Sequence, residues 1–334
     1  MEVDTALYGL TDAPHRAREL EAIGFDGVFA FEGPHDVFLP LALAAEATAL
    51  RVWSNVAIAF PRNPVHLAHT ARDLQLLSRG RFVLGLGTQV RSHIERRFGA
   101  EFDRPVRRMS DLIAAVRAIL NTWQTGAGLD HRGPYYSHTM MSPMFDPGPS
   151  EWGPPPIHVG ALGPHLTEMV AAEADGILLM PFTSRRFFEH HTLPAIAEGV
   201  QRRRHGLGEL EVVPELILCA GRDEDEMRRA ESGCRALLGF YASTPAYRPV
   251  LNAEGRGEIQ PVLRQMTRDG RWDEMAGLID DELLALIAVR GDPESIARQV
   301  AERYAGHASR VAVYMPYETS DDLLGEIVDA LHAL

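Results

Sequence analysis

The sequence predicts an α/β protein built as a closed (β/α)8 TIM barrel with insertion segments. Eight short runs rich in β-branched and other apolar residues alternate with longer segments in which apolar residues recur at helical spacing. Strands that alternate with helices in this way are typical of a parallel sheet, and eight such units in 334 residues favour the closed barrel. An open, doubly wound sheet is the alternative.

The first half of the sequence contains four strand–helix units. Short apolar runs predict strands at 3–9, 25–31, 51–60 and 81–87. Apolar residues spaced three and four positions apart predict helices at 14–24, 40–50, 64–80 and 105–120. Gly24 and Gly80 stand at the ends of the first and third helices, and Pro64 stands at the start of the third. Proline is favoured at a helix start and glycine just past a helix end, so these positions support the predicted bounds.

In the second half, a Pro- and Gly-rich segment at 126–156 interrupts the alternation, which then resumes. Strands are predicted at 156–161, 175–181, 209–221 and 310–316, and helices at 164–174, 186–204, 223–240, 293–306 and 320–334. The segment 242–290 is irregular and is expected to be helical in parts. Because neither irregular segment has the composition of a linker, we interpret both as insertions in a single domain, 1–334.

Composition excludes several classes of function. A net charge of −13 disfavours nucleic acid as a partner, because phosphates require a cationic surface. The sequence contains no lysine, which excludes lysine Schiff-base enzymes and the P-loop. No run approaches the roughly 18 apolar residues of a membrane span, and the first residues show no basic leader. With two cysteines, Cys219 and Cys234, in no zinc-binding spacing, we expect a cytoplasmic protein without a membrane partner.

The stretch RFVLGLGTQVRSHIERRFG begins like a dinucleotide-binding turn. Val90 stands where that fingerprint needs its third glycine, so a Rossmann turn is excluded. In a barrel, the stretch lies at the C-terminal end of strand four, where active sites form. Gly85 and Gly87 are expected to let a ligand approach the backbone, and the alternative is a solvated strand-to-loop turn. The polar residues that follow are Thr88, Gln89, Arg91, His93, Arg96 and Arg97.

Two further strand ends carry candidate chemistry. In PIHVGALGPHLTEM, Gly160 ends a strand, and Gly163 with Pro164 opens a helix whose free N–H groups suit a phosphate. In FEGPHDVF, Glu32 and His35 put a carboxylate and an imidazole at the catalytic face, as acid–base chemistry near pH 7 requires. The alternatives are a plain strand-to-helix turn and a helix-capping loop.

Together, in this order, these turns resemble the bacterial luciferase-like flavin and deazaflavin oxidoreductases. The resemblance covers about residues 4–317 and is carried by FDGVFAFEGPHD, AIAFPRNPVHLAHTARDLQLLSRGRFVLGLGTQ and HVGALGPHLTEMVAAEADGILLMP. The motifs EGPHD and GTQ-x-R-x-H-x-x-RRFG look most like the branch that uses coenzyme F-420, an 8-hydroxy-5-deazaflavin. Members that oxidise glucose 6-phosphate have a catalytic Glu where Val90 stands, and they bind the sugar phosphate partly through Lys, so that subgroup is not expected.

The resemblance implies a coenzyme that lies across the C-terminal face of the barrel, in a homodimer. It also implies a non-prolyl cis peptide in strand three, placed at Asn55–Val56. The implied cofactor contacts are Asn55, Val56, Ala57, Thr88, Gln89, Arg91, His93, Gly160, Leu162, Gly163, His165 and Leu166. Because the coenzyme tail is anionic, the arginines at 91, 96 and 97 are expected to offset its charge locally.

The implied activity is hydride transfer between the deazaflavin and a small organic substrate. Hydride transfer is accompanied by a proton, for which His35 is the predicted donor or acceptor, with Glu32 binding the ring edge or orienting His35. Phe60, Tyr135, Trp152 and Met180 suggest an apolar substrate pocket. The alternatives are an FMN-dependent monooxygenase served by a separate reductase, a barrel hydrolase with a metal at Glu32 and His35, and a non-catalytic binding protein.

Overall fold

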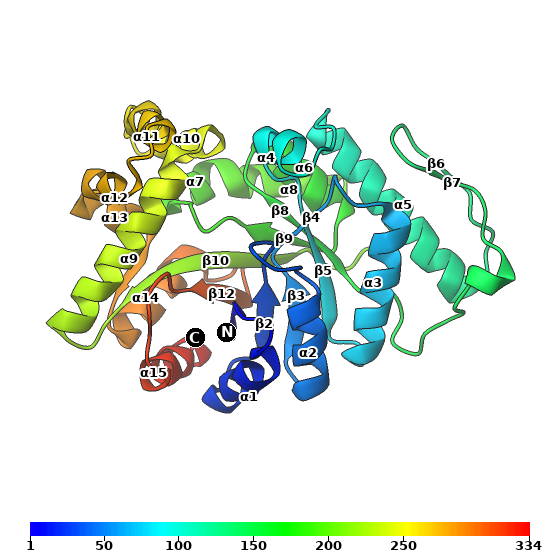
Figure 1. The fold of residues 1–334 in the computed structure, drawn as a ribbon, viewed down its shortest axis with the longest axis horizontal. Coiled ribbons are helices and arrows are strands. Elements are labelled where there is room, and N and C mark those ends of the chain that lie inside the picture. The colour runs from blue at the N-terminus through cyan, green and yellow to red at the C-terminus, as the bar shows by residue number, and fades with distance from the viewer.

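The chain forms a closed eight-stranded parallel barrel, which a computed structural model describes for all residues, 1–334 (Figure 1). The barrel strands are β1 (Glu2–Ala6), β2 (Gly27–Ala30), β3 (Arg51–Ser54), β5 (Phe82–Gly87), β8 (Ile157–Ala161), β9 (Gly176–Leu179), β10 (Glu211–Ala220) and β12 (Arg310–Tyr314). The long β10 pairs with β9 through its first residues and with β12 further along, and β12 pairs with β1. The predicted TIM barrel is therefore confirmed, and the open sheet is wrong.

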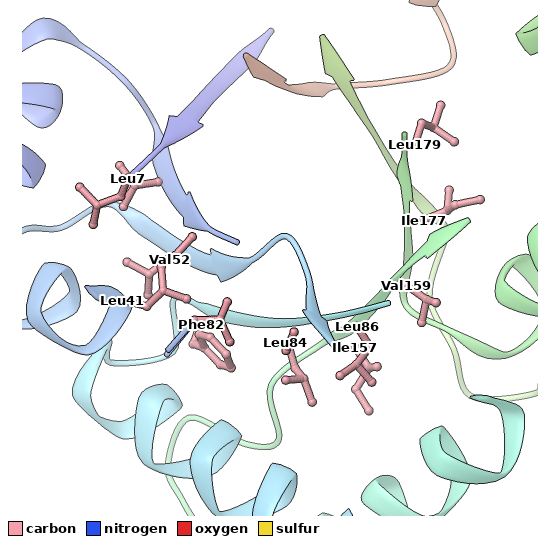
Figure 2. Packing of buried hydrophobic residues seen from close by; sticks show 14 of the residues in the cluster. Leu7, Leu41, Val52, Phe82, Leu84, Leu86, Ile157, Val159, Ile177 and Leu179 are labelled. Atoms are coloured by element: carbon pink, nitrogen blue, oxygen red, sulfur yellow. The ribbon is translucent and has the colours of Figure 1, made fainter. Parts of the chain in front are cut away.

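Helices surround the barrel. They are α1 (Ala13–Ile23), α2 (Leu39–Ala47), α3 (Pro64–Leu77), α5 (Pro105–Thr125), α6 (Pro164–Glu173), α7 (Arg185–Phe187), α8 (Leu193–Gln201), α9 (Glu224–Ser243), α14 (Pro293–Tyr304) and α15 (Asp321–His332). Figure 2 shows Phe82, Leu84 and Val159 pointing from their strands toward these helices, where they join the main hydrophobic core. No helix combines the length and the apolar character needed to cross a bilayer.

Three local predictions need correction. The strand expected at 51–60 is two strands, β3 and β4 (Ala57–Ile58), because the chain turns at a cis peptide between Asn55 and Val56. The helix expected at 186–204 is α7 and α8 joined by a π-helical turn at Phe188–Thr192. Residues Arg91–Arg96, after β5, form a short helix, α4, which the sequence did not predict.

The two insertions lie on opposite sides of the barrel (Figure 1). The first carries the hairpin β6 (His131–Arg132) and β7 (Ser137–His138) and a 3-10 turn at Pro143–Phe145. The second contains 3-10 turns at Pro245–Tyr247 and Ala276–Leu278, the helices α10 (Arg248–Ala253), α11 (Ile259–Arg268), α12 (Trp272–Met275) and α13 (Asp281–Ile287), and the strand β11 (Val289–Gly291), which pairs with the end of β10. Its helices share a second hydrophobic cluster with α9 and thereby hold this insertion over the C-terminal end of β10.

The barrel interior begins, at the N-terminal ends of the strands, with a layer of buried charges. Asp4 is fully buried and accepts hydrogen bonds from the Trp53 indole, at 2.8 Å, and from Arg310. Burial raises the pKa of Asp4 to about 6, although Arg310 and Arg51 favour its ionised form. A Cβ atom at Gly27 would lie 2.5 Å from the Asp4 carboxylate, so glycine is needed there to make room for it.

A second carboxylate completes this layer. Glu211, the first residue of β10, makes a bidentate ion pair with Arg51 at 2.7 and 2.8 Å and lies 3.3 Å from the His158 imidazole. Burial opposes ionisation, but hydrogen bonds from His158 and Arg51 hold the pKa of Glu211 well below its usual range. Above it, an apolar layer that includes Phe29, Val83 and Val213 separates these charges from the opposite end of the barrel.

Candidate active site

A cavity of about 550 Å³ opens at the C-terminal ends of the barrel strands. This is the face on which TIM-barrel enzymes place their active sites. Most of the predicted site residues line it: Glu32, Asn55, Val56, Thr88, Gln89, Gly160, Leu162, Gly163, His165 and Leu166. Four others do not line the cavity: His35, Ala57, Arg91 and His93. Ten of the fourteen predicted site residues therefore lie together around one cavity, and their roles stay predictions.

The cis peptide at Asn55–Val56 forms one wall of the cavity, at the position that the family resemblance implied. Ser54, the residue before it, exchanges hydrogen bonds with Gly85: its Oγ donates to the Gly85 carbonyl at 2.8 Å and accepts from the Gly85 N–H at 2.9 Å. The side chain of Val56 then lies against β5 and β8. The turn thus aims Asn55 and Val56 into the cavity.

The glycines of the GLG motif make room for this turn. A Cβ atom at Gly85 would lie 1.7 Å from the Ser54 carbonyl oxygen, and one at Gly87 would lie 2.2 Å from Val56. The expectation that Gly85 and Gly87 admit a ligand to the backbone is therefore wrong for Gly85. Gly87 does line the cavity, but the side chain of Val56 fills the space that a side chain at position 87 would need.

Glu32 is held by fixed partners. Its carboxylate accepts hydrogen bonds from the Ile58 N–H at 2.8 Å and from Arg62 at 2.6 Å, and Arg62 also donates to the Ile58 carbonyl. These contacts tie the end of β2 to β4, directly after the cis peptide. Glu32 therefore positions the cavity wall, and its partners are Ile58 and Arg62 rather than His35.

His35 lies on an exposed loop outside the cavity lining. In the same loop, Asp36 accepts hydrogen bonds from the N–H groups of Phe38 and Leu39 at the start of α2. This is the helix-capping arrangement that was the alternative for FEGPHDVF. The geometry thus gives His35 no contact with the other site residues.

The arginines that follow β5 also lie outside the lining. Arg91 is exposed, pairs with Glu95 at 2.7 Å and stacks on Phe102. His93 is exposed on the same short helix. Arg97 donates to the Gly33 carbonyl at 3.0 Å, which joins this segment to the loop after β2. Ala57, the residue after Val56, is fully buried in β4 and does not line the cavity.

The N-terminus of α6 faces the cavity without a side-chain cap. Gly163 is its N-cap residue, Pro164 is the first helical residue, and no side chain accepts a hydrogen bond from the first turn. A Cβ atom at Gly163 would meet nothing within 4 Å, so open space adjoins this helix end. Free N–H groups and the helix dipole favour an anion there. The turn fits the phosphate that the sequence predicted for it.

The most perturbed acid in the cavity, Glu215, was missed by the sequence reasoning. It lies on β10, is half-buried and lines the cavity. Its one hydrogen-bond donor is the Asn55 side-chain amide, at 2.9 Å. Burial raises the pKa of Glu215 to about 7, and the Asn55 hydrogen bond offsets this only in part. A carboxyl group in this state can give or take a proton near neutral pH.

Three tyrosines that the sequence reasoning did not select also line the cavity: Tyr241, Tyr247 and Tyr314. Of the four residues that suggested an apolar pocket, Met180 lines it, whereas Phe60, Tyr135 and Trp152 do not. The structure contains no group of three or more His, Cys, Asp or Glu side chains arranged to hold a metal ion.

Comparisons with known proteins agree with this geometry. Residues 2–310 match the family model described as luciferase-like monooxygenase. An uncharacterized Mycobacterium tuberculosis protein, Rv1360, is 42% identical over 90% of this chain and 89% of its own. A putative coenzyme F420-dependent oxidoreductase of the same organism, Rv3520c, is 26% identical over 84% of each chain.

Solved structures share the fold at low sequence identity. The coenzyme F420-dependent tetrahydromethanopterin reductase from Methanopyrus kandleri superimposes with a TM-score of 0.83 at 18% identity, over 99% of this chain and 98% of its own. The EDTA monooxygenase from Chelativorans sp. BNC1 superimposes with a TM-score of 0.68 at 16% identity, over 99% of this chain and 92% of its own.

Proposed function

Because the chain belongs to the luciferase-like monooxygenase family, we propose that it is an oxidoreductase that transfers a hydride between coenzyme F-420 and a small organic substrate. The observation that carries the proposal is one cavity that combines the Asn55–Val56 turn, an uncapped helix N-terminus and the acid Glu215, whose pKa is raised. The names of the relatives that use coenzyme F420 support the deazaflavin. An FMN-dependent monooxygenase is the second candidate, and the likeness to EDTA monooxygenase favours a monooxygenase.

The residues present fit such a cofactor. Val56 and the cis turn supply a rigid apolar wall for a flat ring, and Thr88 and Gln89 supply polar groups beside it. Gly163, His165 and Leu166 surround the anion-favouring helix end, where the phosphate would bind. When bound, the deazaflavin supplies a ring carbon that accepts or donates hydride.

The protein's own part is to position groups and to handle the proton. We assign the proton transfer to Glu215, because its carboxyl group lines the cavity and has a pKa of about 7. Asn55 fixes one carboxyl oxygen of Glu215, and Glu32 with Arg62 fixes the strand that follows the turn. His35 is the alternative proton carrier, and it would have to reach the cavity by a movement of its loop. A homodimer and a cytoplasmic location stay predictions.

A titration with matched variants tests the cofactor assignment. Purified protein is titrated with coenzyme F-420 and with FMN, and binding is followed by absorbance and fluorescence. We expect F-420 to bind more tightly than FMN. Gly163→Asp should abolish binding, because its carboxylate would occupy the anion site at the start of α6.

Gly163→Ala is the control, since its methyl group has open space and adds no charge. It should keep the affinity within about tenfold, a change of about 1.4 kcal/mol. Tight binding of FMN with no binding of F-420 would favour the monooxygenase. Wild-type affinity in Gly163→Asp would place the phosphate elsewhere.

A further inference from the structure

We propose, resting on the proposed function, that the tyrosine-lined end of the cavity is the substrate chamber. We infer that it takes a planar, largely apolar molecule without negative charge, which presents one hydrogen-bonding group to the phenols of Tyr241 and Tyr247 or to Glu215. The chamber would therefore reject carboxylates and phosphates. Neither the family match nor the named relatives assign a substrate to this chain.

The first argument is the aromatic character of the chamber walls. Phe31 and Tyr314 line the cavity, and both pack against Tyr8, with ring centroids 5.9 Å apart in each pair. Tyr241 and Tyr247 also line it and pack edge to face at 5.6 Å. Flat, rigid rings in the lining favour a flat apolar ligand, because stacking and edge contacts with it cost little side-chain entropy.

The pair Tyr241 and Tyr247 is held in place by a buried neighbour. Phe182 is fully buried and lies 6.1 Å from the Tyr241 ring and 5.7 Å from the Tyr247 ring. Tyr241 lies in the last turn of α9 and Tyr247 in the first 3-10 turn of the second insertion, so the packing of this insertion fixes the chamber wall. The wall is thus specific to the way this insertion folds.

The second argument is charge. No arginine lines the cavity, and the sequence contains no lysine. Glu32 is neutralised by Arg62, whereas the carboxyl group of Glu215 faces only the Asn55 amide. His165, the one imidazole of the lining, belongs to the uncapped end of α6. An anionic substrate beside Glu215 would find no compensating cation in a poorly solvated site.

The tyrosines reinforce this selectivity. Burial raises the pKa of Tyr247 to about 12 and that of Tyr241 well above its usual value, and the nearby Glu215 carboxylate adds to both shifts. Both phenols therefore stay protonated at neutral pH and can only offer neutral hydrogen-bonding groups. Together with Glu215 they suit a carbonyl or hydroxyl group on the ligand.

Two probes with the same ring system test the proposal: 2-acetonaphthone, which is uncharged, and 2-naphthoate, which is its anionic counterpart. Binding to the cofactor-free protein is measured by calorimetry at pH 8, where Glu215 is largely ionised. We expect 2-acetonaphthone to bind at least about tenfold more tightly than 2-naphthoate. Glu215→Gln should reduce this preference about tenfold by admitting 2-naphthoate, while binding of 2-acetonaphthone changes little.

Glu46→Gln, on the exposed face of α2, makes the same chemical change outside the cavity and should leave both affinities unaltered. Tyr247→Leu should weaken the binding of 2-acetonaphthone without weakening, in a separate titration, the binding of F-420. This result would place the probe in the chamber. Equal affinity of the two probes, no binding of 2-acetonaphthone, or a preference unchanged by Glu215→Gln would overturn the proposal. Because no cofactor is present, these outcomes are independent of the F-420 titration, whose failure would instead overturn the proposed function.

Discussion

Two glutamates on the same strand of the barrel, four residues apart, have opposite surroundings. Glu211 lies in the charged layer at the N-terminal end, where Arg51 binds it with two hydrogen bonds and His158 adds a third contact. Glu215 lies at the C-terminal end, where only the Asn55 amide contacts its carboxyl group. Burial acts on both, yet the pKa of Glu211 falls below its usual range and that of Glu215 rises to about 7.

The difference shows how partners decide the role of a buried acid. Glu211, whose hydrogen bonds to Arg51 and His158 outweigh the effect of burial, stays ionised at physiological pH, whereas Asp4 in the same layer keeps a raised pKa despite its contact with Arg310. A carboxyl group with one neutral donor, such as Glu215, keeps both protonation states within reach, which is the property that a general acid or base needs. In this barrel, Glu211 lies at the N-terminal end and Glu215 lies at the end where the cavity opens.

The largest effect expected from the contrast between Glu211 and Glu215 is a loss of catalytic rate. With a substrate that the wild-type enzyme turns over, Glu215→Gln should lower kcat by about 10²–10⁴-fold, the usual loss for a general acid or base. Coenzyme affinity should change little, because the substitution keeps the shape of the side chain. Steady-state kinetics as a function of pH, combined with coenzyme titration, measures both quantities.

His35→Ala is the matched competitor in the same assay. The exposed position of His35 leads us to expect nearly wild-type turnover for this variant. If the kcat of His35→Ala instead falls by about 10²–10⁴-fold and Glu215→Gln keeps its activity, the proton passes through His35 in the loop after β2, as the sequence predicted. The assignment to Glu215 would then fall.

The next effect concerns the charged layer. Arg310 is buried beside Asp4 and lies 3.5 Å from Glu211, so Arg310→Met would leave the buried Asp4 carboxylate without its hydrogen-bonded counterion, whereas Glu211 would keep Arg51. Removing one partner of a buried ion pair costs about 3–5 kcal/mol, and we expect that loss in the free energy of unfolding in urea. Arg96→Met, at an exposed residue that forms no ion pair, should cost less than about 0.5 kcal/mol. A similar cost for the two variants would show that the charged layer contributes no stability.

Much of the fold could be read from the sequence because the alternation of strands and helices is itself a local pattern. The interruption of strand three could not be read from composition, because the β-branched and aromatic residues of RVWSNVAIAF favour a strand and outweigh the single Asn55. The turn there depends on contacts with Gly85 and Gly87, which lie about 30 residues away. Only the family resemblance located it.

The site was predicted where it depends on strand ends and missed where it depends on packing. Thr88, Gln89 and Gly163 follow strands directly, and parallel strands bring their ends together. Glu215 lies inside a strand. The pattern that could have identified it is a carboxylate two residues after Val213 in an apolar run, because residues two apart in a strand point to the same face. Tyr247 belongs to an insertion without regular periodicity, so its approach to the cavity follows from its packing against Phe182.

The smallest expected effect is the pH dependence of stability that Glu215 contributes. In the unfolded chain its pKa is close to 4.5, and in the folded protein it is about 7. Between these values the folded protein holds a proton that the unfolded chain has released, so stability falls as pH rises. The fall is complete near pH 7 and amounts to at most about 3.5 kcal/mol, at about 1.4 kcal/mol per pH unit.

The comparison of wild type with Glu215→Gln isolates this contribution. Asp4 and Glu211 also titrate differently in the folded and unfolded states, but they are present in both proteins and cancel in the difference. Urea unfolding from pH 5 to pH 8 should therefore show wild type losing stability relative to Glu215→Gln up to pH 7, with a constant difference above it. Glu46→Gln should give a flat difference throughout. A flat difference for Glu215→Gln as well would mean that Glu215 ionises normally, and the contrast with Glu211 would then lose its basis.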